Sequence, residues 1–178
     1  MRGVAAGDRD YYINAGGTNQ HGFESELSAW LVRAAEKRFI KSLLFRNSLT
    51  LSSFEFSKYT SGGVDFSGNN LTGVPKSSVV TSIEAVALDR LSLFVQHSFT
   101  SRLPLNDANS VYADDYHLVG ARASWKLKVT ADKAVLFAGV DNVLNERYSL
   151  GNDLNAFGGR YFNPAARRNY FAGINVRF

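Results

Sequence analysis

The sequence predicts an all-β protein, an antiparallel up-and-down meander of about seven to eight strands that forms part of a transmembrane β-barrel. Three observations predict this class. Several segments alternate apolar and polar residues with the two-residue period of a strand. The connections between these segments alternate between short and long. No run approaches the roughly 20 apolar residues that a membrane-spanning helix requires.

The composition alone does not separate this class from a water-soluble domain. The chain has 178 residues, 45% of them apolar, which suits one domain of either kind. A barrel wall alternates lipid-facing apolar residues with polar residues that face the lumen, so its average composition stays ordinary. The absence of cysteine excludes disulfides, thiolate metal sites and a cysteine nucleophile. The 20 basic residues exceed the 16 acidic ones but are scattered, so we expect no nucleic-acid partner.

The first five predicted strands each carry apolar residues on one side and mainly polar residues on the other. The apolar side holds Phe23, Leu27, Ala29 and Leu31 in the first; Leu43, Phe45, Leu49 and Leu51 in the second; Ile83, Ala85 and Ala87 in the third; Leu91, Leu93, Val95 and Phe99 in the fourth; and Val119, Ala121, Ala123, Trp125 and Leu127 in the fifth. Such faces suit a wall between lipid and water.

The last two predicted strands are less regular. The sixth spans 135–148, is apolar on both sides at first, and loses its alternation at Asp141 and Asn142, which predicts a β-bulge there. The seventh closes the chain and alternates cleanly except at Phe171. An eighth strand is predicted within 1–14.

The connections predict how the two ends of the sheet differ. Short connections lie at 34–38, 88–90 and 128–132, and long ones at 57–76, 101–115 and 150–164. In an up-and-down sheet, all short turns then fall at one end and all long loops at the other. Outer-membrane barrels show this asymmetry, with short periplasmic turns and longer extracellular loops.

Aromatic residues gather next to the predicted long loops, as expected of an interfacial girdle. They are Tyr59, Phe66, Tyr112, Tyr116, Tyr148, Tyr161, Phe162 and Tyr170. Aromatic residues are also common in strands and hairpins of any kind.

Three stretches resemble one protein family. The run GVDNVLNERYSLGNDLNAFGGRYFNPAARRNYFAGINVRF, residues 139–178, resembles the end of the barrel of TonB-dependent outer-membrane receptors, with a penultimate-strand motif at 142–148 in which Val143 stands where Leu is usual. NAGGTNQHGFESEL, residues 14–27, and GNNLTGVPKSSV, residues 68–79, resemble an Asn-containing turn with its strand and a loop of the same barrels. The likeness covers nearly the whole chain from Asn14.

The resemblance implies a role for the last strand. In this family the final strand with its terminal aromatic residue is similar to the signal read by the barrel-assembly machinery, by strand addition at an exposed edge. Here the corresponding residues are Tyr170, Ala172, Ile174, Val176 and Phe178.

The resemblance also implies a fragment. Receptors of this type look like barrels of about 22 strands closed by a plug domain, so we expect residues 1–178 to be a carboxy-terminal barrel segment without the plug. The implied setting is the outer membrane of a Gram-negative bacterium. The implied partners are the lipid bilayer, the plug, the TonB energy-transducing complex and a ferric siderophore or similar bulky nutrient, and we expect no transport by the isolated segment. The alternatives are a free-standing small outer-membrane barrel with a binding or structural role and, third, a soluble β-sandwich.

Two groups of polar residues are candidate sites. Strand parity and the cost of a charge facing lipid, roughly 2–4 kcal/mol for Arg or Lys at the bilayer midplane, predict a lumen position for Glu24, Glu26, Glu84 and Arg122. In the last long loop, side chains that offer hydrogen bonds beside aromatic faces suit either a chelated iron complex or an ordered hairpin; they are Asn152, Asp153, Asn155, Arg160 and Tyr161.

No catalytic, cofactor or metal site is predicted. His21, His97 and His117 are too dispersed in sequence for a metal-binding spacing. No nucleophilic triad, paired-carboxylate pattern or phosphate-binding loop stands out, so we do not expect an enzyme.

Overall fold

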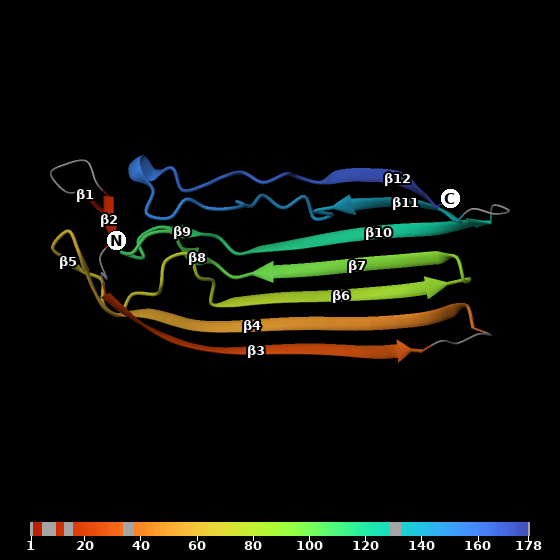
Figure 1. Cartoon of the computed structure of the whole chain (residues 1–178), viewed down its shortest axis with the longest axis horizontal. Coiled ribbons are helices and arrows are strands. Elements are labelled where there is room, and N and C mark those ends of the chain that lie inside the picture. Colours follow the sequence, from red (N-terminus) through yellow and green to blue (C-terminus); the bar gives the residue numbers. More distant parts are fainter. Residues whose placement is uncertain (1, 5–9, 13–15, 34–37, 129–132, 178) are drawn as a thin grey trace.

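The computed structural model describes residues 2–4, 10–12, 16–33, 38–128 and 133–177, and seven of its strands form a single layer (Figure 1). Their order across the sheet is β12-β11-β10-β7-β6-β4-β3, and each runs antiparallel to its neighbours. Their bounds are β3 Gly16–Val32, β4 Ile40–Ser61, β6 Ser77–Ala87, β7 Leu91–Thr100, β10 Tyr116–Lys128, β11 Lys133–Asp141 and β12 Asn169–Arg177. The predicted antiparallel meander is confirmed, as an open sheet with β3 and β12 at its edges.

Short elements flank this path in the described part of the chain. They are β1 Arg2–Val4, β2 Asp10–Tyr12, β5 Val64–Asp65, β8 Leu103–Pro104, β9 Tyr112–Ala113 and the 3₁₀ turn η1 Phe157–Gly159. β5 extends β4 as a hairpin, while β8 and β9 pair with each other. In place of the single strand predicted within 1–14, the structure has two short strands, β1 and β2, which pair with each other in a sheet of their own.

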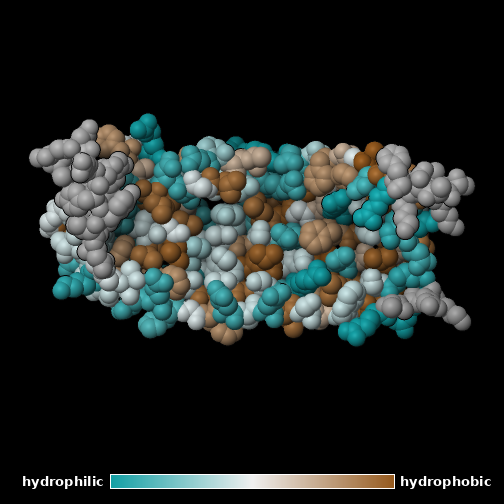
Figure 2. All heavy atoms as spheres, viewed as in Figure 1, coloured by the Kyte–Doolittle hydropathy of each residue, from teal (hydrophilic) through white to brown (hydrophobic). Residues whose placement is uncertain are grey.

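The sheet leaves its apolar face uncovered. Strand register places Leu27, Leu93 and Ile174 on one face, and their side chains are 57%, 41% and 58% exposed. On the face that Figure 2 views, hydrophobic side chains are exposed between hydrophilic ones across the middle of the sheet. Among the described residues, the buried apolar side chains are only Leu44, Ala87, Leu105, Ala113 and Ala134. A face of this kind requires an apolar environment outside the sheet.

The apolar face has the length of a transmembrane strand. On β10 it extends from Val119 to Leu127, and on β4 from Leu43 to Leu51 with one interruption. Each stretch is nine residues long, within the roughly 9–11 that a tilted membrane-spanning strand uses. Beyond Leu51 the pattern of β4 reverses, because Phe54 lies on the polar face.

The two ends of the sheet differ as predicted. The turn between β6 and β7 is closed by Arg90 N–H donating to Ala87 O at 3.2 Å. The long connections, with β5, β8, β9 and η1, gather at the opposite end, while the carboxyl end of β12 lies at the turn end (Figure 1). The other two predicted turns fall largely at 34–37 and 129–132, outside the described residues.

The sixth predicted strand, 135–148, is too long, since β11 ends at Asp141. Asn142 follows in the left-handed region with φ 51°, which a regular strand cannot continue. Val143 N–H still donates to Val119 O on β10 at 2.7 Å. The irregularity predicted at Asp141 and Asn142 is therefore present, but it ends the strand.

Two phenylalanines cover two glycines across the last hairpin, which explains the exception at Phe171. Phe171 pairs with Gly139, and Phe137 pairs with Gly173, in register on the polar face. A Cβ at Gly139 would clash with the Phe171 ring and the carbonyl oxygen of Ala121, and a Cβ at Gly173 would clash with the Phe137 ring. This reciprocal packing fixes the register of β11 against β12.

Gly139→Ala should therefore destabilise the sheet by about 1–3 kcal/mol, the usual cost of overpacking. Gly120→Ala is the matched control, because it lies on the same face and its Cβ would meet no heavy atom closer than 3.8 Å. The test is urea unfolding in detergent micelles, followed by the far-ultraviolet strand signal. Equal unfolding midpoints for the two variants would contradict the packing argument.

Candidate functional site

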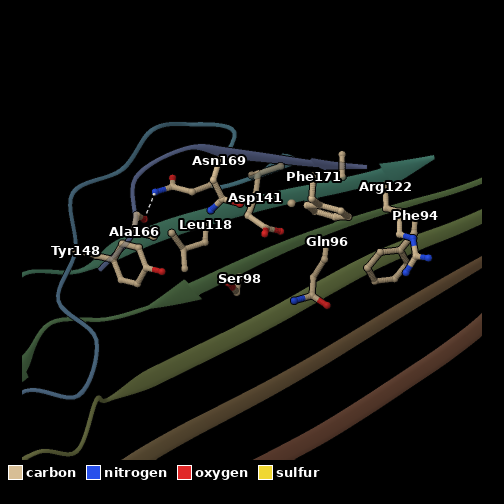
Figure 3. Close-up of a pocket in the computed structure, with 14 residues that line it drawn as sticks. Phe94, Gln96, Ser98, Leu118, Arg122, Asp141, Tyr148, Ala166, Asn169 and Phe171 are labelled. Atoms are coloured by element: carbon tan, nitrogen blue, oxygen red, sulfur yellow. Dashed lines mark hydrogen bonds between the residues drawn. The ribbon is translucent and has the colours of Figure 1, made fainter. Parts of the chain in front are cut away.

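A pocket of about 490 Å³ lies on the polar face of the sheet, over β7, β10 and the last two strands. Figure 3 shows side chains from these strands pointing into it, including Gln96, Arg122 and Phe171. The Arg122 guanidinium stacks 4.4 Å from the centre of the Phe137 ring. Such a surface can hydrogen-bond a polypeptide or polar solute.

At the loop end, Asp107 ties three long segments together. Its carboxylate accepts hydrogen bonds from Tyr59 Oη at 3.0 Å, Thr72 Oγ1 at 2.6 Å and Asn155 Nδ2 at 3.0 Å. Its backbone N–H donates to Asn155 Oδ1 at 3.0 Å, and its carbonyl accepts from Asn69 Nδ2 at 2.7 Å. Asp107, which lies in the long connection 101–115, therefore bonds to both of the other long connections, 57–76 and 150–164.

Further bonds brace the same junction. Asn109 Oδ1 accepts from the Asn70 N–H at 2.8 Å, and Asn109 Nδ2 donates to Asn70 O at 2.9 Å. Asn155 N–H donates to Leu105 O at 2.9 Å, and the Leu105 side chain is completely buried. We call Tyr59, Thr72, Asp107 and Asn155 the rim cluster.

Burial and, second, the hydrogen bond to Asp107 raise the pKa of the Tyr59 phenol above its usual value. Tyr59 lies eight residues beyond the apolar stretch of β4, at the loop end. A raised pKa keeps the phenol protonated, so it remains a donor to Asp107 until the solution is strongly alkaline. The contribution of the protonated Tyr59 phenol to folding stability is complete at a pH below the pKa of Tyr59 in the unfolded chain. It is lost as the pH rises through the higher pKa of Tyr59 in the folded chain.

The structure separates the five predicted loop residues. Asp153 N–H donates to Tyr161 O at 3.0 Å, so these two lie together through the backbone. The Asn155 side chain is occupied by Asp107. Arg160 is exposed, and the buried Asn152 Oδ1 has no hydrogen-bond partner among the described residues. A role for these residues in ligand binding stays a prediction.

Several of the predicted girdle residues are in contact. Tyr59 lies beside Phe66, Tyr116 beside Tyr148, and Tyr161 beside Phe162, with ring centres 5.8, 4.9 and 6.5 Å apart. Arg102 stacks 4.5 Å from the centre of the Tyr112 ring. These aromatic residues stand at the loop end of the sheet.

The four predicted lumen residues share the polar face. Glu24, Glu26 and Glu84 face the same side by register, and so does Arg122. Glu84 pairs with Arg46, N to O 3.4 Å, with both side chains about half exposed. Such a pair contributes little to stability, and a lumen position for this face stays a prediction.

The predicted assembly strand is β12. Tyr170, Ala172, Ile174 and Val176 share its apolar face, and Tyr170 is 74% exposed. The β12 edge away from β11 has no partner strand in the described sheet. Phe178 lies outside the described residues. Recognition by the assembly machinery stays a prediction.

The motif at 142–148 builds the entry to the last loop. The Asn142 side chain, 6% exposed, donates to Glu146 O at 2.9 Å and Ala166 O at 3.4 Å, and its Oδ1 accepts from the Glu146 N–H at 2.8 Å. Asn145 Oδ1 accepts from Arg167 Nε at 3.0 Å. The two asparagines join this turn to the chain entering β12, a role that sequence reasoning did not assign.

Sequence reasoning also missed a histidine pair. His97 Nε2 lies 3.0 Å from His117 Nδ1, on the apolar face where β7 and β10 approach the loop end. The two histidines are separated by twenty residues in the sequence, so no local pattern indicates their contact. The pairing of their two strands in a hairpin was the signal that could have predicted it.

The described part of the chain contains no helix with the length and hydrophobicity that a membrane span requires. A one-layer antiparallel sheet with nine-residue apolar stretches, turns at one end and braced loops at the other is a segment of an outer-membrane type of barrel wall. The chain belongs to the TonB-dependent receptor-like β-barrel family, whose model matches residues 2–143. Barrels of this family are receptors of the Gram-negative outer membrane.

Solved structures share the fold. The siderophore receptor PiuA from Acinetobacter baumannii matches with a TM-score of 0.69 at 18% identity, over 90% of this chain and 22% of that receptor. BauA, the ferric preacinetobactin receptor from the same organism, matches with a TM-score of 0.57 at 17% identity, over 89% of this chain and 26% of that receptor. The chain therefore spans about a quarter of the length of these receptors.

Proposed function

We propose that residues 1–178 are the carboxy-terminal barrel segment of a receptor that takes up a ferric siderophore or a similar bulky nutrient complex across the outer membrane. The carrying observation is the rim cluster, which braces three long loops at one end of a membrane-length sheet. The fold shared with siderophore receptors supports the ligand class.

The proposed partners follow from the two faces. The apolar face contacts the lipid bilayer, and the polar face, with its pocket at Arg122, contacts the plug domain in the complete receptor. The TonB complex pulls on that plug, and the barrel-assembly machinery reads β12. The isolated segment has an open sheet and does not perform energised uptake.

In this proposal some residues of the last loop, 150–164, hold the loop in place and others contact the ligand. Asn155 holds the loop against Asp107, whereas Arg160 and Asp153 are exposed and free to meet a ligand. Leu154 and Phe157 add exposed apolar surface beside them, 47% and 91% exposed. A chelated iron complex combines polar and aromatic surface, which such a mixed rim suits.

The loop assignment is tested in a complete receptor that ends in this segment. Exchanging 150–164 for the corresponding loop of a receptor with another specificity should lower affinity for the original ligand at least about tenfold, since binding residues concentrate on loops, and should leave outer-membrane assembly intact. The measurements are iron uptake and ligand binding on whole cells. Exchange of the 88–90 turn at the opposite end is the control and should change neither.

Unchanged affinity and specificity after the loop exchange would remove 150–164 from the ligand site. The fragment assignment has its own test, reconstitution of the 178-residue chain into lipid vesicles. A closed, ligand-binding barrel formed by the chain alone would instead favour a free-standing small barrel.

A further inference from the structure

We propose that His97 and His117 form a binding site for a divalent transition-metal ion, best filled by Cu²⁺, on the apolar face near the loop end. The two nitrogens that face each other are 3.0 Å apart, the rings are near-parallel at 17°, and their centres are 5.2 Å apart. The Phe99 ring lies 4.6 Å from His117 and supports it from one side. The site is independent of the uptake proposed above.

The spacing fits two neighbouring ligands of one metal ion. Metal–imidazole bonds are about 2.0–2.1 Å long, so two nitrogens at 90–109° around one ion lie about 2.8–3.4 Å apart. The observed separation of 3.0 Å falls in this range. The strands that carry the pair are hydrogen-bonded neighbours, with His97 opposite Val119 and His117 opposite Phe99. The sheet therefore holds both rings without a backbone movement.

Binding requires a change in the rings alone. In the present hydrogen bond one nitrogen donates its proton to the other. For both nitrogens to ligate a metal, the donor ring moves that proton to its other nitrogen, so that two neutral imidazoles each present a lone pair. His117 is exposed and can turn about its side-chain bonds to aim its lone pair outward.

The pair lies at the loop-side end of the apolar stretch of β10. The apolar stretch of β10 begins at Val119, two residues after His117. Beside His97 on β6 stands Thr81, whose hydroxyl accepts a hydrogen bond from Asn47 Nδ2 at 2.8 Å. Thr81 and Asn47 therefore place two polar side chains beside the pair on an otherwise apolar face.

The donor set selects the metal. Imidazole suits Zn²⁺, Cu²⁺ and Ni²⁺, and among divalent first-row ions Cu²⁺ binds such sites most tightly. Within the described residues no cluster of three or more histidine or carboxylate side chains forms a metal site. The remaining positions on the ion therefore fall to water, and the ion is exchangeable.

The test uses the full 178-residue chain folded in detergent micelles, with Cu²⁺ as the probe. Titration calorimetry should show one Cu²⁺ that is lost in the variant with both His97→Gln and His117→Gln. Each single substitution should weaken binding at least about tenfold, because loss of even an indirect partner of a metal ligand costs 10–100-fold. His21→Gln is the matched control and should bind like the unmodified chain.

A measurement on the unmodified sequence avoids dependence on variant folding. With ¹⁵N-labelled histidine, the electron paramagnetic resonance spectrum of bound Cu²⁺ should show coupling to two imidazole nitrogens. Coupling to one nitrogen or none, or retention of full affinity by the double variant, overturns the site. Loss of binding in His21→Gln also overturns it, since the ion would then be held elsewhere.

Discussion

Asp107→Ala should release the three long connections, 57–76, 101–115 and 150–164, from one another, with the largest effect at 150–164. The substitution removes acceptors for Tyr59, Thr72 and Asn155, at 2.6–3.0 Å. At about 1 kcal/mol net for each hydrogen bond, the local opening free energy should fall by about 3 kcal/mol. Limited proteolysis of the folded chain in micelles should then cut these segments about a hundredfold faster.

Asp107→Asn removes the negative charge of the Asp107 side chain but keeps its shape, so it tests the two contributions separately. Asparagine keeps one side-chain oxygen as an acceptor and all backbone bonds, so its cleavage rate should lie between those of the alanine variant and the unmodified chain. Asp65→Ala is the loop control, because the Asp65 side chain accepts its hydrogen bonds from Ser67, two residues away. If Asp107→Ala is cleaved no faster than this control, the rim cluster does not hold the loops together.

The consequence of Asp107→Ala for function follows from preorganisation. Loops that must order themselves on binding lose part of the interaction energy to that ordering. In the complete receptor we therefore expect weaker ligand binding with unchanged amounts of receptor in the outer membrane, as measured on whole cells.

Asn142→Ala should destabilise the end of the barrel segment by about 3 kcal/mol. It removes the two close hydrogen bonds to Glu146 and the longer one to Ala166, each worth about 1 kcal/mol or less net. It also forces alanine into φ 51°, which costs roughly 1–2 kcal/mol. The measurement is urea unfolding in micelles and the amount of assembled receptor in outer membranes.

Asn142→Gly divides this effect into its two causes. Glycine adopts the positive φ without strain but cannot make the side-chain bonds, so it should be more stable than the alanine variant by about 1 kcal/mol. Equal stability of the two variants would show that backbone conformation contributes nothing here. If both variants were as stable as the unmodified chain, the Asn142 side chain would not stabilise this turn.

Much of the fold could be predicted from the sequence because period-two patterns record which face each side chain takes. Leu43, Leu93 and Val119 were assigned to one face by parity alone, and the strand register confirms it. The end of β11 could not be predicted, because the side-chain bonds of Asn142 decide it and the pattern continues beyond it. Strand β4 also extends to Ser61, past the predicted loop start, through pairing with β3 at residues such as Gly16.

The candidate sites were harder to predict than the strands. Asn155 was proposed as a ligand residue, but its amide bonds to Asp107, forty-eight residues away, a partner that no local pattern indicates. The His97 and His117 contact depends likewise on hairpin register. Long-range contacts between loops follow from the assembled sheet, so they become visible only in three dimensions.

The seven-strand path limits the number of further strands that can close this sheet into a barrel. Because neighbours alternate in direction, β3 and β12 run the same way although they are opposite edges. An even ring of alternating strands can include this path only when an odd number of further strands stands between those edges. A single strand would suffice for a narrow pore-free cylinder, and larger odd numbers give progressively wider ones.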